Sequence, residues 1–231
     1  ILLLLGGAGG GVVYLWRTNR AVPQGPDQCA AASVTMVQSI PVGDFEIKPV
    51  AGALATHVAL TELADSASAS LDLTAMYMDL TGEADRKIFN ASEMRRFGAE
   101  GGERVYQALL AAAKRGVSLR ILLGTLQDPI NSTEVRQLLK HPSVQARTWD
   151  PTKWYGGGIM HLKLWHADGR AAYLGSANAD WKSLAQVKEL GVLINGSATG
   201  TGGGPSPVAA SAATADLGRI FEVFWRWADP A

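Results

Sequence analysis

The chain has little of what would assign it to a function class at once. It contains one cysteine, Cys29, which is either a free thiol or paired with something outside these residues. Its 21 basic and 21 acidic side chains cancel, so any polyanion must be held by a local site rather than by an overall field. No H-E-x-x-H motif occurs, and His166 is expected on the strand face opposite His161. A zinc site is therefore not favoured.

Charge is also missing from the first 16 residues, ILLLLGGAGGGVVYLW. This run is shorter than the roughly 20 residues that span a bilayer. Because it opens without a methionine, we expect the end of an uncleaved transmembrane signal anchor at residues 1–16. A cleaved signal peptide and a buried helix are the alternatives. Residues 17–33 are expected to form a stalk, and residues 34–231 a folded domain.

The orientation of this anchor is ambiguous from the residues alone. Arg17 and Arg20 follow the span, which by the positive-inside rule favours a cytoplasmic body. Three glycosylation sequons, at Asn90, Asn131 and Asn195, favour a lumenal body instead.

The domain alternates strand-like and helix-like segments. This alternation predicts an α/β fold with a mixed, mainly parallel sheet and helices on both faces. We expect residues 81–99 to be a charged surface excursion and residues 195–208 a surface loop. The expected strands are 33–42, 71–80, 117–125 and 144–150, and the expected helices are 50–67, 101–116, 131–139 and one around 217–224.

The segment HLKLWHADGRAAYLGSAN, residues 161–178, has a clear hairpin signal in Asp168-Gly169. If these two residues form the turn, Ala167 lies opposite Arg170 and Lys163 opposite Leu174. The alternation of side chains then predicts that four polar groups share one face and that Leu162, Leu164, Tyr173 and Gly175 share the other. The four polar groups are His161, Lys163, Ser176 and Asn178.

This polar set suits an anion. Lys163 supplies a fixed charge, and Asn178 and Ser176 supply hydrogen-bond donors. His161 adds a nucleophile or proton carrier that operates near neutral pH. A phosphate is the natural ligand, because the donors can hold its non-bridging oxygens while an imidazole nitrogen attacks phosphorus. Each residue alone would more often be structural.

The same segment matches H-x-K-x4-D-x6-G-S-x-N and so resembles the phospholipase D superfamily. The contexts YLGSANADWKSLAQVKELGV, MVQSIP, LTAMYMDLTG and IFEVFWRW resemble its endolysosomal branch, family members three and four. The resemblance implies a half-domain of that fold and a covalent phosphohistidine on His161. It makes Lys163, Asn178 and Ser176 phosphate ligands, Glu189 the acid that orients His161, and Asp168 and Gly175 structural, with no metal or cofactor.

Relatives in this branch imply a 5′ exonuclease on single-stranded DNA or RNA, anchored by one transmembrane helix, with a glycosylated lumenal body between the endoplasmic reticulum and the endolysosome. The chain carries one signature, since His57, His141 and His166 lack the H-x-K context. A second motif is therefore expected from a C-terminal half or from a homodimer. Relatives also carry a cysteine near residues 195–204 that could pair with Cys29, and none is present here.

Two other functions remain open from the sequence. The first is a phospholipase or transphosphatidylase acting on lysophospholipids, with the same chemistry and a different leaving group. The second is a non-catalytic, membrane-tethered module that lost its second site. The exposed or buried state of Trp154, Tyr155, Trp165 and Trp181 bears on the choice, because exposed rings can stack on bases.

Overall fold

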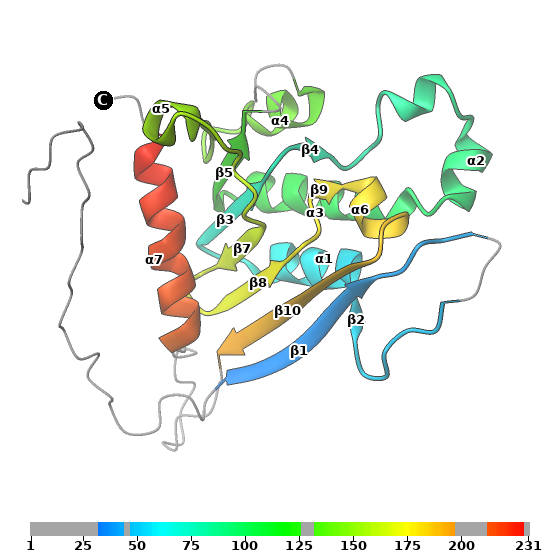
Figure 1. Ribbon diagram of the computed structural model, residues 1–231, viewed down its shortest axis with the longest axis horizontal. Coiled ribbons are helices and arrows are strands. Elements are labelled where there is room, and N and C mark those ends of the chain that lie inside the picture. Colours follow the sequence, from blue (N-terminus) through cyan, green and yellow to red (C-terminus); the bar gives the residue numbers. More distant parts are fainter. Residues whose placement is uncertain (1–31, 44–46, 126–131, 197–211, 229–231) are drawn as a thin grey trace, which may run out of the picture.

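The computed structural model describes residues 32–43, 47–125, 132–196 and 212–228 (Figure 1). The predicted anchor, Cys29 and Asn131 lie outside these ranges, as does most of the predicted loop 195–208. Within the described ranges, no helix combines the length and apolar character needed to cross a bilayer.

One large sheet organises the domain (Figure 1). Its strand order is β2-β1-β10-β8-β7-β3-β5-β6. A short parallel pair, β4 (Met78–Asp79) with β9 (Ala179–Asp180), lies apart from it. The strands of the large sheet are β1 (Ala32–Ser39), β2 (Leu54–Ala55), β3 (Ser70–Ala75), β5 (Ser118–Gly124), β6 (Val144–Trp149), β7 (Leu164–Ala167), β8 (Ala171–Gly175) and β10 (Glu189–Gly196).

The sheet is mixed, and the expectation that it is mainly parallel is wrong. Strands β3, β5 and β6 are parallel, as is the β1–β2 pair. The ladders β1–β10, β10–β8, β8–β7 and β7–β3 are antiparallel. The reason is the β7–β8 hairpin, which reverses the chain in the middle of the sheet, followed by β10, which reverses it again.

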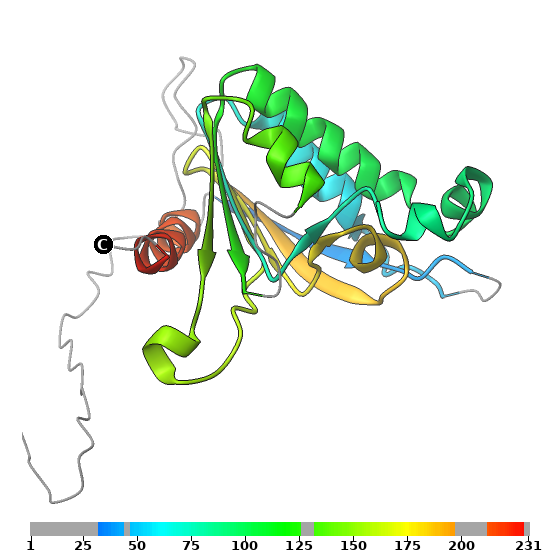
Figure 2. The ribbon, with the colours of Figure 1, turned by 90° about the horizontal axis from the view of Figure 1, so that it is seen from above.

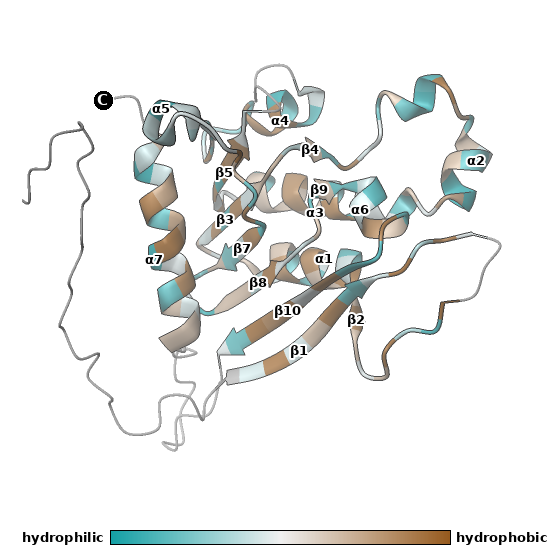
Figure 3. Ribbon diagram, in the orientation of Figure 1, coloured by the Kyte–Doolittle hydropathy of each residue, from teal (hydrophilic) through white to brown (hydrophobic). Residues whose placement is uncertain are grey.

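Helices cover both faces of the sheet, as predicted. Helices α1 (Thr56–Ser66) and α3 (Glu100–Lys114) lie together on one face, and α7 (Ala212–Trp227) lies on the other (Figure 2). Apolar and polar residues alternate along α7 (Figure 3), and Leu217, Phe221 and Trp225 are buried against the sheet. Shorter helices occur at α2 (Ala91–Arg96), α4 (Thr133–Leu138), α5 (Thr152–Tyr155) and α6 (Trp181–Ala185), with a 3-10 turn at Asp85–Lys87.

Two expected segments differ from the structure. The helix predicted over 50–67 begins only at Thr56, because a turn with Gly52 at φ 76° precedes it and Leu54–Ala55 pairs with β1. Residues 81–99 are not merely an irregular excursion. They include α2, whose Met94 is buried in a small cluster with Ala99 and Trp181.

Candidate active site

The predicted catalytic and phosphate-binding residues lie at one edge of the sheet, the edge at which the parallel strands β3, β5 and β6 end. Strand β8 also ends there and is followed by Ser176 and Asn178. The antiparallel strands β7 and β10 begin there, so His161 and Lys163 arrive just before β7 and Glu189 opens β10 (Figure 1). The residues before β7, the residues after β8 and the first residue of β10 therefore meet at the carboxyl edge of the sheet.

The hairpin register differs by one residue from the prediction. Leu164 pairs with Leu174 and Ala167 with Ala171, so Arg170 belongs to the turn. Asp168 and Gly169 both have positive φ, 52° and 70°, and the Arg170 amide donates to the Ala167 carbonyl at 3.0 Å. The turn was correctly located, but it contains three residues instead of two, and the extra residue shifts the pairing of every position beyond it.

This shift corrects the predicted distribution of side chains between the faces. Tyr173 packs with Trp165 in the core under α1 and α3, whereas Leu164 packs toward α7 with Leu162 and Leu174. Tyr173 therefore does not share a face with Leu164. Ser176 is exposed, and its hydroxyl donates to the Leu190 carbonyl at 3.1 Å and accepts from the Leu190 amide at 3.0 Å. Its role as a phosphate ligand stays a prediction.

Thr74 fixes the segment that carries the H-x-K residues. Its fully buried hydroxyl accepts from the Leu164 amide at 2.8 Å and donates to the Leu162 carbonyl at 3.0 Å. These two hydrogen bonds fix the backbone on both sides of Lys163. Sequence reasoning missed this residue. The available signal was a hydroxyl inside a strand expected to be largely buried, because buried hydroxyls need partners.

Lys163 is held in an unusual environment for a lysine, with an exposed fraction of 2%. Its ammonium donates to the His161 carbonyl at 2.8 Å, which ties the two motif residues together. Burial lowers the pKa of Lys163 from its ordinary 10.5, and the negative charge of Glu189 opposes that shift. Glu189 therefore lies close enough to act on the ammonium electrostatically.

His161 is exposed, which leaves its ring open to a substrate. Among the described residues no hydrogen bond joins its imidazole to Glu189, so the role of Glu189 as the orienting acid stays a prediction. Glu189 is half-buried and pairs across the β1–β10 ladder with Ser39.

Asn178 reaches the site from the bend after β8. Its Oδ1 accepts from the Met76 amide at 3.2 Å, just beyond the end of β3. The Tyr77 hydroxyl is hydrogen-bonded to Asp180 and Asn178, and burial, followed by the charge of Asp180, raises the pKa of Tyr77 to about 12. The phenol therefore stays protonated. Because Oδ1 is occupied, the amide nitrogen of Asn178 is the group available to an anion.

Asp168 joins the hairpin turn to the start of β3 through hydrogen bonds. At the turn, away from the other motif residues, its carboxylate accepts from the amides of Ser68, Ala69 and Ser70 at 2.8–2.9 Å and from the Ser68 hydroxyl at 2.8 Å. Burial alone would raise the pKa of Asp168, but these hydrogen bonds outweigh it and hold the pKa below its ordinary 3.8. The motif aspartate thus fastens the hairpin to the start of β3.

We expect Asp168→Ala to lower the free energy of unfolding by about 3 kcal/mol, the scale of hydrogen bonds to a charged group. Because the folded-state pKa is lowered, this contribution is present above pH 3.8 and is lost as the pH falls through the lowered pKa. Denaturant unfolding at pH 7 and at pH 3 measures both effects. Asp65→Asn, on the exposed end of α1, is the control. An equal loss at both pH values would contradict this role.

Gly175 is required by a close approach. A Cβ there would lie 2.2 Å from the Tyr173 Oη, and one at the paired Gly191 would lie 2.6 Å from the same ring. Two glycines on adjacent strands thus let the Tyr173 ring lie across the backbone. Burial raises the pKa of Tyr173 to about 12.

Gly175→Ala should therefore displace Tyr173 and disturb the bend that carries Asn178. We expect a loss of about 2–3 kcal/mol in the free energy of unfolding. Gly157→Ala, where a Cβ meets nothing within 4 Å, should cost far less in the same melt. Equal stability of the two variants would contradict the crowding at Gly175.

The predicted glycosylation sites have different settings. The Asn90 side chain accepts from the amides of Ser92 and Glu93 and caps α2. Asn195 lies within β10, paired with Ser33 and Ala171. The use of either sequon stays a prediction. No group of His, Cys, Asp and Glu that could hold a metal ion occurs in the part of the chain that the structure describes.

A family model described as "Cardiolipin synthase, PLD-like domain" matches residues 60–201, more than half of the chain. The chain belongs to the phospholipase D superfamily. The match includes the whole 161–178 segment and Glu189. The prediction that this chain is a phospholipase D-like domain is confirmed.

Named relatives agree with this assignment. The chain is 32% identical to phospholipase D Y of Dictyostelium discoideum over 203 residues, covering 88% of this chain and 41% of that protein. It is 32% identical to human 5'-3' exonuclease PLD3 over 219 residues, covering 92% of this chain and 40% of that protein. This phospholipase D-like domain thus spans about two fifths of these curated relatives.

The fold is also found among solved structures. Nuc, a phospholipase D family member from Salmonella typhimurium, has a TM-score of 0.54 and 16% identity, with 86% of this chain and 97% of that chain covered. At that identity the likeness supports the fold alone. It places the mixed sheet and its helix layers within the phospholipase D architecture.

Proposed function

We propose that this chain is one half of a phosphodiesterase that forms a covalent phosphohistidine on His161. The observation that carries the proposal is a buried Lys163 ammonium that donates to the backbone carbonyl of the exposed His161 at the carboxyl edge of the sheet. Lys163 and Asn178 bind the non-bridging oxygens, where negative charge accumulates as the nucleophile approaches. No metal ion is needed for that neutralisation in this scheme.

The reaction proceeds in two displacements. An imidazole nitrogen of His161 bonds to phosphorus and one ester oxygen leaves, taking a proton from a general acid. Water then attacks phosphorus and gives a proton to the deprotonated general acid, the bond between phosphorus and nitrogen breaks, and a phosphate monoester is released. The general acid is the histidine of a second H-x-K motif, supplied from outside residues 1–231 or by a second copy of this chain.

The substrate we propose is single-stranded nucleic acid, cleaved from its 5′ end in an acidic lumenal compartment. Similarity to proteins named 5'-3' exonuclease PLD3 over 92% of this chain supports it. Exposed rings support it too. Trp154 and Tyr155 are 55% and 68% exposed and lie at the end of α5, just before the loop that leads into His161. Trp165 and Trp181 are buried. Trp154 itself rests on Trp227, with ring centroids 5.7 Å apart.

A 590 Å³ cavity beside the site could receive the organic part of such a substrate. Tyr77, which contacts Asn178, forms part of its wall. Lys87 and Arg136 line the same cavity together with Asp79, Glu83 and Glu134, so its acidic side chains outnumber its basic ones by one. Burial raises the pKa of Asp79, which favours its neutral form next to a phosphate.

The second candidate is a phospholipase or transphosphatidylase, supported by the similarity to phospholipases D Y and Z of Dictyostelium discoideum. The chemistry at His161 would be the same. One comparison decides between them: turnover of a 5′ end-labelled single-stranded oligonucleotide against turnover of a lysophospholipid, both in chelator. Faster hydrolysis of the lipid at equal concentration would overturn the exonuclease proposal.

Substitutions of Trp154 and Tyr155 give a sharper test of whether the substrate is nucleic acid or lipid. We expect Tyr155→Ala to raise KM for an oligonucleotide about 10-fold, because stacking on one base contributes about 1–3 kcal/mol. Val34→Ala, at an exposed position of β1 on the opposite edge, is the matched control. An unchanged KM in Tyr155→Ala and Trp154→Ala would show that these rings do not contribute to substrate binding.

A further inference from the structure

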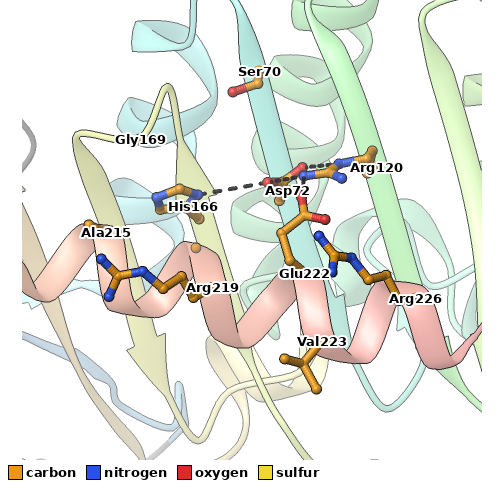
Figure 4. A pocket seen from close by; sticks show the side chains of 11 residues that line it. Ser70, Asp72, Arg120, His166, Gly169, Ala215, Arg219, Glu222, Val223 and Arg226 are labelled. Atoms are coloured by element: carbon orange, nitrogen blue, oxygen red, sulfur yellow. Dashed lines mark hydrogen bonds and ion pairs between the residues drawn. The ribbon is translucent and has the colours of Figure 1, made fainter. Parts of the chain in front are cut away.

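A row of polar side chains lies beneath α7, on a sheet face that is otherwise largely apolar. His166 on β7 pairs across the ladder with Asp72 on β3, and Asp72 pairs with Arg120 on β5. The three side chains therefore stand side by side on neighbouring strands (Figure 4). Burying such groups is costly unless each finds a partner.

Two of the three are fully engaged. Arg120 donates to both carboxylate oxygens of Asp72, at 2.6 and 2.8 Å, and to Glu222 of α7 at 2.7 Å. Its guanidinium also lies over the rings of Phe221 and Trp225. Both carboxylates are thereby held by Arg120, and they offer little to a cationic ligand.

His166 is the exception. It is 7% exposed, and both of its ring nitrogens are buried without a hydrogen-bond partner in the described residues. Its Nδ1 is 3.7 Å from Asp72, beyond hydrogen-bond distance. The ring is seated against the backbone of α7, since a Cβ at Gly218 would lie 2.8 Å from it. A buried imidazole with two open positions calls for an explanation.

His166 lines a cavity of about 580 Å³ between α7 and the sheet (Figure 4). Arg219 and Arg226 also face this cavity from α7. Arg219 pairs with Asp216, but Arg226 has no hydrogen bond or ion pair among the described residues. Arg120 binds both Asp72 and Glu222, but its single charge balances only one of these two carboxylates. The donors left for a ligand in this cavity are on Arg226, Arg219 and His166. The cavity walls include Ser70, Asp72, Arg120, His166, Glu222 and Arg226.

We propose that this cavity is a second anion site, which binds the phosphate group of a small phosphomonoester through Arg226, Arg219 and His166. The volume exceeds that of phosphate alone and falls within the range of small-molecule pockets. The site is distinct from the proposed active site, because Ser70 and Gly169 place it at the hairpin turn, the edge opposite His161. It does not depend on the proposed catalytic function.

The test is a titration of the Lys163→Met protein, which weakens binding at the active site. Inorganic phosphate is the primary probe, followed by adenosine monophosphate, glycerol 3-phosphate and adenosine. Amide NMR shifts of Gly169 and Gly218 report this cavity, and those of residues near His161 report the other. Arg226→Gln is the test variant, because Arg226 is exposed and the change should not unfold the protein. Arg219→Gln is the second.

We expect saturable shifts at Gly169 and Gly218 with phosphate, a dissociation constant raised at least about 10-fold by Arg226→Gln, and no response to adenosine. Tighter binding of adenosine monophosphate or of glycerol 3-phosphate identifies the organic part as nucleoside or glycerol. An absence of saturable shifts, or shifts confined to residues near His161, would overturn the proposal. So would equal affinities in the parent protein and both arginine variants.

Discussion

Replacing His161 with alanine is expected to lower kcat/KM for phosphodiester cleavage by about 10^4-fold or more. The reason is that an imidazole nitrogen forms the covalent bond to phosphorus, and no other described side chain of the site offers an equivalent nucleophile. The loss should fall on kcat, because Lys163 and Asn178 still hold the phosphate. His161 is exposed, so the fold should be unaffected.

The matched control for that variant is His141→Ala. His141 precedes β6 at the opposite edge of the sheet and lacks the H-x-K context. Turnover of the labelled oligonucleotide in chelator measures both variants. Activity within 10-fold of the parent in His161→Ala would exclude His161 as the nucleophile, whatever the control shows.

Lys163→Met should separate catalysis from stability. We expect activity to fall about 10^3-fold, because a fixed charge aimed at the phosphate oxygens is lost. We expect the free energy of unfolding to stay the same or to rise by about 1 kcal/mol, because a buried ammonium is replaced by a side chain suited to burial. The lowered pKa of Lys163 predicts a change in the free energy of unfolding with the same sign. The folded state binds this proton less strongly than the unfolded state, so the charged lysine costs stability below pH 10.5.

Lys163→Arg tests whether charge alone is enough. The longer, planar guanidinium does not fit a space shaped for an ammonium that donates to the His161 carbonyl, so we expect little recovery of activity. Urea unfolding and oligonucleotide turnover on the three proteins give both quantities. A Met variant that is less stable by more than about 2 kcal/mol would show that Lys163 is a structural ion, contrary to this account.

The family could be predicted from the sequence because its signature resides in residue types at fixed spacing. The position of the Asp-Gly turn and the strands on either side followed from local signals, whereas the phosphate-binding roles of His161, Lys163 and Asn178 stay predictions. The register did not, because it depends on whether Arg170 belongs to the turn or to the strand. That choice is coupled to a tertiary contact, the binding of residues 68–70 by Asp168.

Other predictions also failed because they depend on contacts between residues that are far apart in the sequence. The sheet was expected to be mainly parallel because alternation of strands and helices does not say where β10 inserts. Thr74 and Tyr77 were missed because each acts on a segment that is distant in the sequence. Thr74 is hydrogen-bonded to the 161–164 backbone, and Tyr77 is hydrogen-bonded to side chains of the 178–180 bend. His166 was weighed only as a zinc ligand and as a second catalytic histidine. The cavity that it lines under α7 could not be predicted, because that required the positions of both β3 and α7.

The central claim is that His161 forms a covalent bond to phosphorus at the carboxyl edge of the sheet. Mass spectrometry of an acid-free, rapidly quenched reaction tests it, using this chain together with a source of the proposed second H-x-K motif and an oligonucleotide substrate. We predict a phosphoryl adduct on the peptide that contains His161, absent in His161→Ala and undiminished in His141→Ala. An adduct on any other residue, or none under conditions where product forms, would contradict the account.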